Sequence, residues 1–155
     1  MYKFNIDIKP ANEIDELGRL KYLIMKLVIA GKTVELVSLV LENIEQLSWF
    51  IENEEAIRYT RCPLDIENSC SIAEGINLLY DKLDYDSDVL DKLYMFRSQH
   101  ALRFAFRGQD IPDIFIALNN DQYEVSCSDE NCKCHYVVDI DSLFHEVRKL
   151  IEYNK

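Results

Sequence analysis

The chain has 155 residues, of which 48% are apolar and 29% are charged. These are values of a folded globular protein, and they exclude a disordered chain. The 28 acidic residues outnumber the 17 basic ones, which gives a formal net charge of −11. Such a surface repels phosphate backbones and anionic lipids, so we expect neither a nucleic-acid partner nor a membrane partner.

The length fits one domain over residues 1–155. The first seven residues are too polar for a secretory signal, and the longest apolar stretch, residues 22–30, is too short to span a bilayer. We therefore expect a cytoplasmic protein with reduced thiols. Cys62 and Cys70 share a predicted loop, where a regulatory disulfide is the alternative to a reduced pair.

The first half of the chain begins with strand patterns. Apolar and polar residues alternate over residues 2–9, which predicts a strand that ends at Pro10. Residues 20–40 hold two apolar runs on either side of Gly31-Lys32, and their β-branched residues favour a β-hairpin that turns there. A helical hairpin capped by Gly31 is the alternative, because periodicity does not separate short apolar runs.

Two capping signals predict helices in the middle of the chain. Asn43 and Gln46 form a variant of the capping box, and Ser71 and Glu74 form a second one. The apolar faces predicted for these two helices are Ile44, Leu47, Phe50, Ile51 and Ile57 for the first, and Ile72, Ile76, Leu79 and Leu83 for the second. A loop over residues 59–69 separates them, and a short helix over residues 89–94 follows.

The last third alternates with period two again. We expect a four-stranded antiparallel meander over residues 102–107, 114–118, 123–127 and 132–140. A final helix capped by Asp141 follows, with the apolar face Leu143, Phe144, Val147, Leu150 and Ile151. The predicted fold is therefore α+β: a mostly antiparallel sheet of N-terminal strand, hairpin and meander, with about three to four helices packed on one face.

A cluster of sulfur and imidazole ligands falls within the meander. Cys127, Cys132, Cys134 and His135 are residue types that bind zinc, but their spacing is not that of a usual zinc knuckle. A four-residue turn would place Cys127 opposite Cys132, and alternation places the thiols on the core face and His135 on the other. We favour buried, unreactive thiols over a metal site, and we expect no cofactor.

The chain has one cluster of basic residues, which comprises Arg97, His100, Arg103 and Arg107. Guanidinium groups at this density are suited to a carboxylate or phosphate ligand, with Arg103 and Arg107 on one strand face. The favoured alternative is that these side chains form ion pairs with Asp110 and Asp113 on a solvated surface.

A cluster of acidic residues follows Trp49-Phe50 on the first predicted helix and comprises Glu52, Glu54 and Glu55. If exposed, it offers a site for a basic partner, and a solvated helix face is the favoured alternative. The sequence lacks a Walker loop, a dinucleotide-binding glycine pattern and a His-Glu-x-x-His motif. We therefore do not expect an enzyme.

One discontinuous segment resembles a known group of proteins. It comprises residues 97–103, Gly108, residues 111–113 and residues 123–126, and none of its motifs is a catalytic signature. It looks like a segment of small uncharacterised bacterial proteins, some of which resemble components of toxin-immunity pairs. Where an aromatic residue is expected after Glu-Val-Ser, this chain has Cys127.

The leading hypothesis is a non-enzymatic acidic binding protein, an immunity protein that neutralises a basic toxin. The resemblance and the net charge favour it. Two alternatives stay open. One is a small enzyme or anionic-ligand sensor that uses the patch from Arg97 to Arg107. The other is a self-associating structural domain that pairs through an exposed sheet edge.

Overall fold

The computed structural model describes residues 1–63, 65, 70–82 and 87–155. Its strands are β1 (Tyr2–Pro10), β2 (Lys21–Ile29), β3 (Lys32–Leu41), β4 (Phe115–Asn119), β5 (Gln122–Asp129) and β6 (Cys132–Asp139). Its helices are η1 (Ile44–Leu47), α1 (Ser48–Glu52), α2 (Glu54–Tyr59), α3 (Ile72–Tyr80), α4 (Ser87–His100), η2 (Leu102–Phe104) and α5 (Ile140–Tyr153), where η marks a 3-10 helix.

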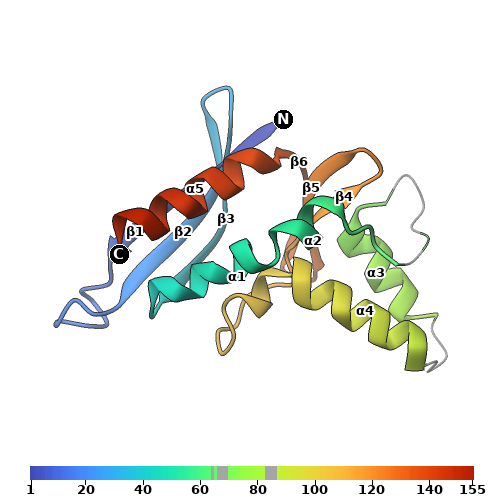
Figure 1. Cartoon of the computed structure of the whole chain (residues 1–155), viewed down its shortest axis with the longest axis horizontal. Helices are drawn as coiled ribbons and strands as arrows, with labels where there is room; N and C mark the ends of the chain where they lie inside the picture. The colour runs from blue at the N-terminus through green and yellow to red at the C-terminus, as the bar shows by residue number, and fades with distance from the viewer. Residues whose placement is uncertain (64, 66–69, 83–86) are drawn as a thin grey trace.

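The strands form one six-stranded sheet in the order β3-β2-β1-β6-β5-β4 (Figure 1). Neighbouring strands are antiparallel except β1 and β6, which pair in parallel where Tyr2 lies opposite Val138. The α+β class and the mostly antiparallel sheet are thus confirmed. Among the described residues, no helix combines the length and the apolar character needed to cross a membrane.

The predicted β-hairpin of residues 20–40 is confirmed, and the helical alternative is wrong. The turn lies at Ala30-Gly31, one residue earlier than predicted, and both residues have positive φ, 47° and 78°. Positive φ at both central residues is the geometry that matches the twist of two antiparallel strands. Gly31 adopts it without a steric cost.

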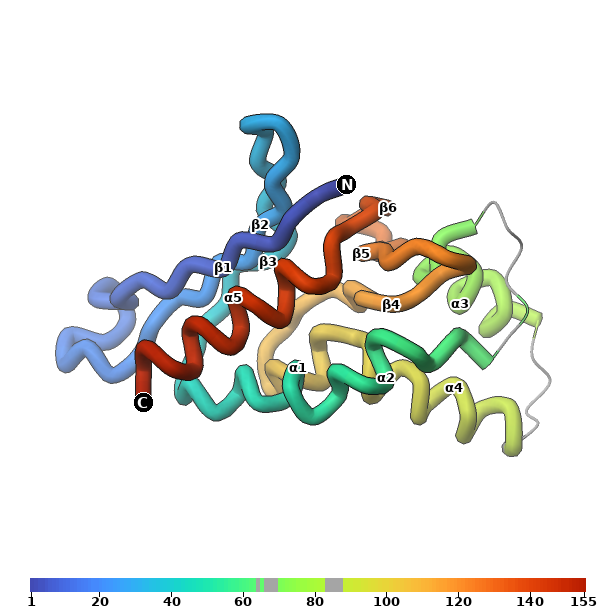
Figure 2. Tube along the Cα trace, turned by 45° about the horizontal axis from the view of Figure 1, so that its top comes forward, coloured from blue at the N-terminus to red at the C-terminus, as the bar shows by residue number. Residues whose placement is uncertain are grey.

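The helix predicted from Asn43 begins there, with both hydrogen bonds of the capping box in place. It runs as three short pieces, η1, α1 and α2, rather than as one helix (Figure 2). Ile51 was expected on its apolar face and is instead 37% exposed.

The next two predicted helices also differ from expectation in detail. Ser71 caps α3 as predicted, with Ile72 and Ile76 buried and Leu79 half-buried, whereas Leu83 lies outside the described residues. The helix predicted over residues 89–94 is longer and reaches His100.

The meander has three strands rather than four. Residues 102–104 form η2, and Ala101 makes one isolated bridge to Phe115 in place of a strand ladder. The burial of Leu102, Ala105 and Phe106 follows helical spacing, which explains why this segment coils. The turn after β5 is also shorter than predicted, so Cys127 lies opposite Cys134 and Cys132 lies opposite Asp129.

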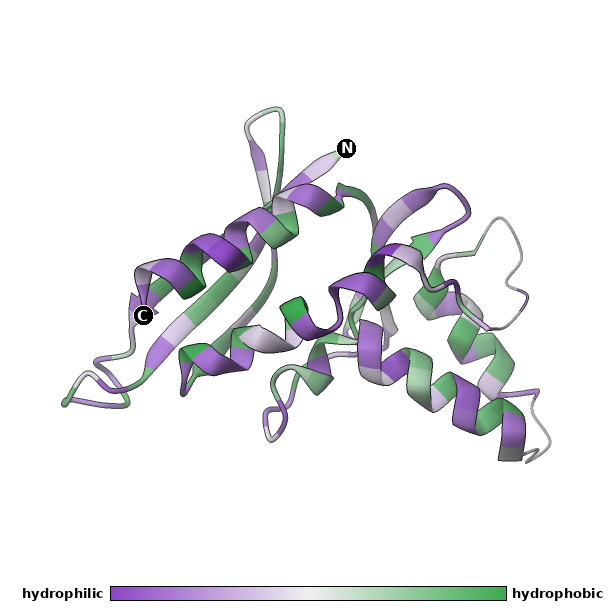
Figure 3. Ribbon diagram, viewed as in Figure 1, coloured by the Kyte–Doolittle hydropathy of each residue, from purple (hydrophilic) through white to green (hydrophobic). Residues whose placement is uncertain are grey.

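Two apolar cores lie on opposite faces of the sheet, so the expectation of helices on one face is wrong. The larger core joins Leu143, Phe144 and Val147 of α5 to alternate residues of the strands (Figure 3 shows green, hydrophobic residues on the strands behind α5). The smaller core lies beneath α3 and α4 and takes the opposite side of β4, through Phe115 and Ala117. The end of the sheet at β4 and β5 is therefore covered on both faces.

Candidate functional site

Three of the four predicted basic residues converge in space. Arg97, Arg103 and Arg107 line one open depression of about 350 Å³, together with Tyr94, Phe104, Gly108 and Gln109. We call this depression the arginine pocket. Helix α4 contributes Tyr94 and Arg97, η2 contributes Arg103 and Phe104, and the turn after η2 contributes the rest.

The turn after η2 is fixed to the sheet by Gln109. Its side-chain amide donates to the Val40 carbonyl at 2.6 Å and accepts from the Val40 N–H at 2.9 Å. Gln109 thereby takes the place of a neighbouring strand at the edge of β3. Gly108 has φ of 90°, a conformation that side chains disfavour, and it lets the turn reverse beside Arg107.

Asp113 holds two of the three arginines. Its carboxylate lies 3.0 Å from Arg97 and 3.3 Å from Arg103, which confirms the expected ion pairing for these two residues. Asp110 forms no ion pair within the described part of the chain. The Arg107 guanidinium instead lies over the Phe104 ring, 5.5 Å from its centre.

His100 does not join the arginine pocket. Its side chain is fully buried and stacks on the Phe96 ring at 3.9 Å. Nδ1 faces the Phe96 carbonyl at 2.7 Å, and Nε2 faces the Ala56 carbonyl at 3.1 Å. The ring therefore ties the end of α4 to α2, and burial lowers its pKa from the ordinary value of 6.5.

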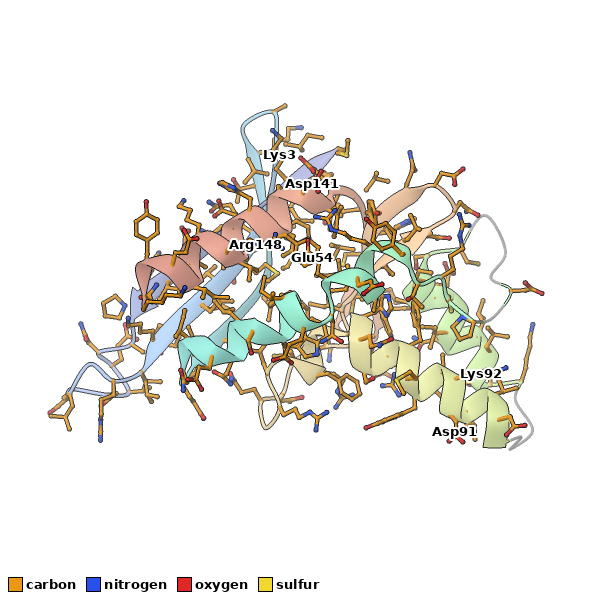
Figure 4. The ribbon with its side chains drawn as sticks, in the orientation of Figure 1. Lys3, Glu54, Asp91, Lys92, Asp141 and Arg148 are labelled. Atoms are coloured by element: carbon orange, nitrogen blue, oxygen red, sulfur yellow. The ribbon has the colours of Figure 1, made fainter. Side chains whose placement is uncertain are left out.

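The three predicted acidic residues separate into two groups. Glu54 is turned inward, where it binds Arg58 of its own helix at 2.9 Å and Arg148 of α5 (Figure 4 shows Glu54 and Arg148 approaching from the two helices). Its charge is neutralised, so it offers little to a partner. Glu52 and Glu55 are exposed.

The cysteine cluster does not close around a common centre. His135 lies on the other face of the sheet, where it binds Glu124, and the described residues contain no set of three or more His, Cys, Asp or Glu placed to hold a metal ion. Cys127 is buried, and burial raises its pKa to about 12 and that of Cys134 to about 11. Both thiols are therefore protonated at neutral pH.

These pKa values predict unequal thiol reactivity. At about pH 8 a thiol with a pKa near 11 is roughly one-thousandth thiolate, so iodoacetamide should modify Cys127 and Cys134 far more slowly in the native protein than in the unfolded chain. Peptide mass spectrometry of the native protein measures this directly. Unfolding in urea is the control and should make all five cysteines react alike. Equal rates at Cys134 in the native and the unfolded protein would contradict the burial of the cluster.

Sequence reasoning missed a buried polar group that anchors the N-terminus of α3. The Ile72 N–H donates to Glu124 at 2.7 Å, and the Ala73 N–H donates to Ser126 at 3.1 Å. Ser71 accepts from the next free N–H, that of Glu74. Glu124 and Ser126 alternate with core residues and resemble any solvent-facing pair, so the sequence carries no signal that α3 covers them.

The same carboxylate orients His135. Glu124 is 2% exposed, and its Oε2 also receives the Asn119 amide at 2.8 Å and lies 2.9 Å from His135 Nε2. A buried carboxylate beside an imidazole occurs in acid–base catalysis, where a nucleophile completes the group. The described partners of this carboxylate are the Ile72 N–H, the Asn119 amide and the His135 ring, so it ties α3 to the sheet.

Comparisons with known proteins identify no relative of the chain. No protein-family model matches the chain, and neither a curated protein nor a solved structure does.

Proposed function

We propose that the protein is a non-enzymatic binding protein that docks a basic protein on an acidic face formed by η1, α1 and α2. The face consists of Glu42, Glu45, Glu52 and Glu55 with the exposed side chains of Ile51 and Tyr59. The partner class that fits both the charge and the sequence resemblance is a basic toxin, and the protein would then be a cytoplasmic immunity protein.

The observation that carries the proposal is that these four glutamates are exposed and unneutralised. None of them forms an ion pair with a described Lys or Arg, whereas the neighbouring Glu54 forms two. Residues 33–57 contain six glutamates and no basic residue, so the charge of this segment is of one sign. Unscreened charge of one sign accelerates the approach of a partner of opposite sign.

The arrangement of the face is also that of a docking surface. Glu45, Ser48, Glu52 and Glu55 recur at helical spacing, so they form one stripe along the three helical pieces. Ile51 and Tyr59 are 37% and 72% exposed beside it. Apolar and tyrosine side chains surrounded by charge are typical of interface centres.

The stripe is held rigidly. Trp49 Nε1 donates to the Ser98 carbonyl at 3.2 Å and fixes α1 against α4. The buried side of α2 packs through Ile57, which is fully buried. A partner would therefore meet a preformed surface, which lowers the entropic cost of binding.

Self-association through a sheet edge receives less support. Gln109 occupies part of the β3 edge, and Arg61 and Ala101 make bridges to β4 at the other edge. Edges covered in this way are poor templates for another strand.

The proposal is tested with two variants of equal net charge. The double variant Glu52→Gln/Glu55→Gln removes two carboxylates from the face, and Glu16→Gln/Glu130→Gln removes two exposed carboxylates elsewhere. Protein captured from the native host at low salt is identified, purified and titrated against each variant by surface plasmon resonance. We expect the face variant to bind about tenfold more weakly, about 1.4 kcal/mol, mainly through a slower association rate.

The salt dependence and the control variant decide the outcome. The control should bind as the wild type does, and raising the ionic strength should slow association for both. An equal loss in both double variants would show a general effect of net charge and contradict a defined face. An association rate indifferent to salt would contradict the electrostatic basis.

A further inference from the structure

The arginine pocket carries charge opposite to that of the rest of the molecule. The chain has a net charge of −11, yet Arg97, Arg103 and Arg107 meet around one depression, where Arg97 and Arg103 share one carboxylate, Asp113. Three guanidinium groups against one carboxylate leave a formal excess of two positive charges. The acidic face makes no use of this site.

Most hydrogen-bond donors of the pocket remain available. Each guanidinium has five N–H donors. Arg97 donates to Asp113 and to the Tyr80 hydroxyl, both at 3.0 Å, and Arg103 donates to Asp113 at 3.3 Å. Among the described residues Arg107 has no carboxylate partner, so its planar fork is open to a ligand.

Aromatic rings orient the arginines before any ligand arrives. Arg97 lies over Tyr80 at 5.7 Å and Arg107 over Phe104 at 5.5 Å. Such contacts restrict a long side chain and reduce the entropy lost on binding. Tyr94 packs edge to face on Phe104 at 5.9 Å and is still 57% exposed, which leaves a free aromatic surface on the wall of the pocket.

We infer that the arginine pocket binds a small organic phosphate, with the phosphate on Arg103 and Arg107 and a flat ring against Tyr94. A phosphate monoester dianion balances the excess of two charges, whereas a carboxylate balances one. The volume of about 350 Å³ suits a small molecule. A nucleic acid strand does not fit, because the acidic remainder of the surface repels its backbone.

Three probes separate the two parts of the ligand. Adenosine monophosphate carries phosphate and ring, glycerol 3-phosphate carries phosphate alone, and adenosine carries the ring alone. Isothermal titration calorimetry on the full chain should give binding of adenosine monophosphate at least tenfold tighter than that of glycerol 3-phosphate. Adenosine should bind more weakly than either.

Exposed arginine variants test the residues without risk to the fold. We expect Arg107→Ala to weaken adenosine monophosphate at least tenfold, and Arg107→Lys to restore part of the loss because it keeps the charge without the fork. Lys92→Ala removes one exposed cation of α4 that does not line the pocket, and it should change the affinity less than twofold (Figure 4 labels Lys92 on α4).

Several results would overturn the inference. If neither phosphate binds at millimolar concentration, the pocket is not a phosphate site. Equal losses of affinity for Arg107→Ala and Lys92→Ala would show that the phosphate is attracted by net charge alone and not by this pocket. Equal affinity for the two phosphates would remove the role of the ring. The variant Glu52→Gln/Glu55→Gln should bind adenosine monophosphate as the wild type does, so failure of the acidic face and failure of the pocket are distinguishable.

Discussion

Replacing Glu124 with alanine should lower the free energy of unfolding by about 3 kcal/mol, because three buried or half-buried donors lose their shared acceptor. The Ile72 N–H at the start of α3 is the most affected, since it lies inside the protein where water does not replace the carboxylate. Urea unfolding followed by circular dichroism measures the loss.

Matched variants locate the effect. Ser126→Ala removes one neutral acceptor from the same helix end and should cost about 1 kcal/mol. Glu130→Ala changes an exposed carboxylate on the following turn and should cost little. Hydrogen exchange at the Ile72 and Ala73 amides should accelerate in Glu124→Ala before exchange in β1 does. Unchanged stability in that variant would mean that the Glu124 carboxylate does not hold α3 in place.

Glu124 also shows where reading from sequence fails in physical terms. Period-two alternation indicates which residues share a face of a strand, but it does not indicate whether a distant segment covers that face. Here α3, some fifty positions away in the chain, covers Glu124 and Ser126. Two local signals were reliable by contrast: Asn43 and Ser71 cap helices as predicted, because a cap involves only its nearest neighbours. The cap predicted at Asp141 is wrong by two residues, since Asp139 caps α5 and accepts from the Asp141 N–H.

The arginine pocket was predicted in part and for the wrong local reason. Arg103 and Arg107 were expected on one strand face, whereas η2 and the turn at Gly108 bring them beside Arg97. Leu102, Phe104 and Phe106 alternate as a strand does, while Leu102, Ala105 and Phe106 also fit a helical turn, and a run this short satisfies both patterns.

His100 was grouped with the arginines because it stands among them in the sequence, beyond the helix predicted over residues 89–94. Helix α4 in fact continues to His100, and Leu93, Phe96 and His100 then form one buried stripe at helical spacing. The predicted end of this helix was six residues too early, so the prediction treated a buried, structural histidine as a ligand-binding one.

The buried ring of His100 predicts a loss of stability on the acidic side of neutrality. Burial is the largest influence and lowers its pKa in the folded protein below 6.5, while hydrogen bonds to backbone carbonyls act in the opposite direction. The unfolded chain therefore binds the proton at a higher pH than the folded one does. Its contribution to stability is complete above about pH 6.5 and declines as the pH falls through the folded-state pKa.

Urea unfolding at about pH 7.5 and about pH 5 measures this decline. His100→Gln removes the titrating ring and its stacking on Phe96, so it should lower the free energy of unfolding at the higher pH by about 2–4 kcal/mol. Its further decline toward pH 5 should be smaller than that of the wild type. His145→Gln, at an exposed histidine of α5, should decline as the wild type does.

The comparison also decides how the two carbonyls are satisfied. A neutral imidazole donates from one nitrogen only, whereas both ring nitrogens of His100 face carbonyl oxygens. If the wild type loses less free energy than His100→Gln does, the ring keeps its proton in the folded protein and donates to both carbonyls, against the direction that burial imposes. If the wild type loses more, the ring is neutral, and the tie between α4 and α2 rests on one donated hydrogen bond and the stacking on Phe96.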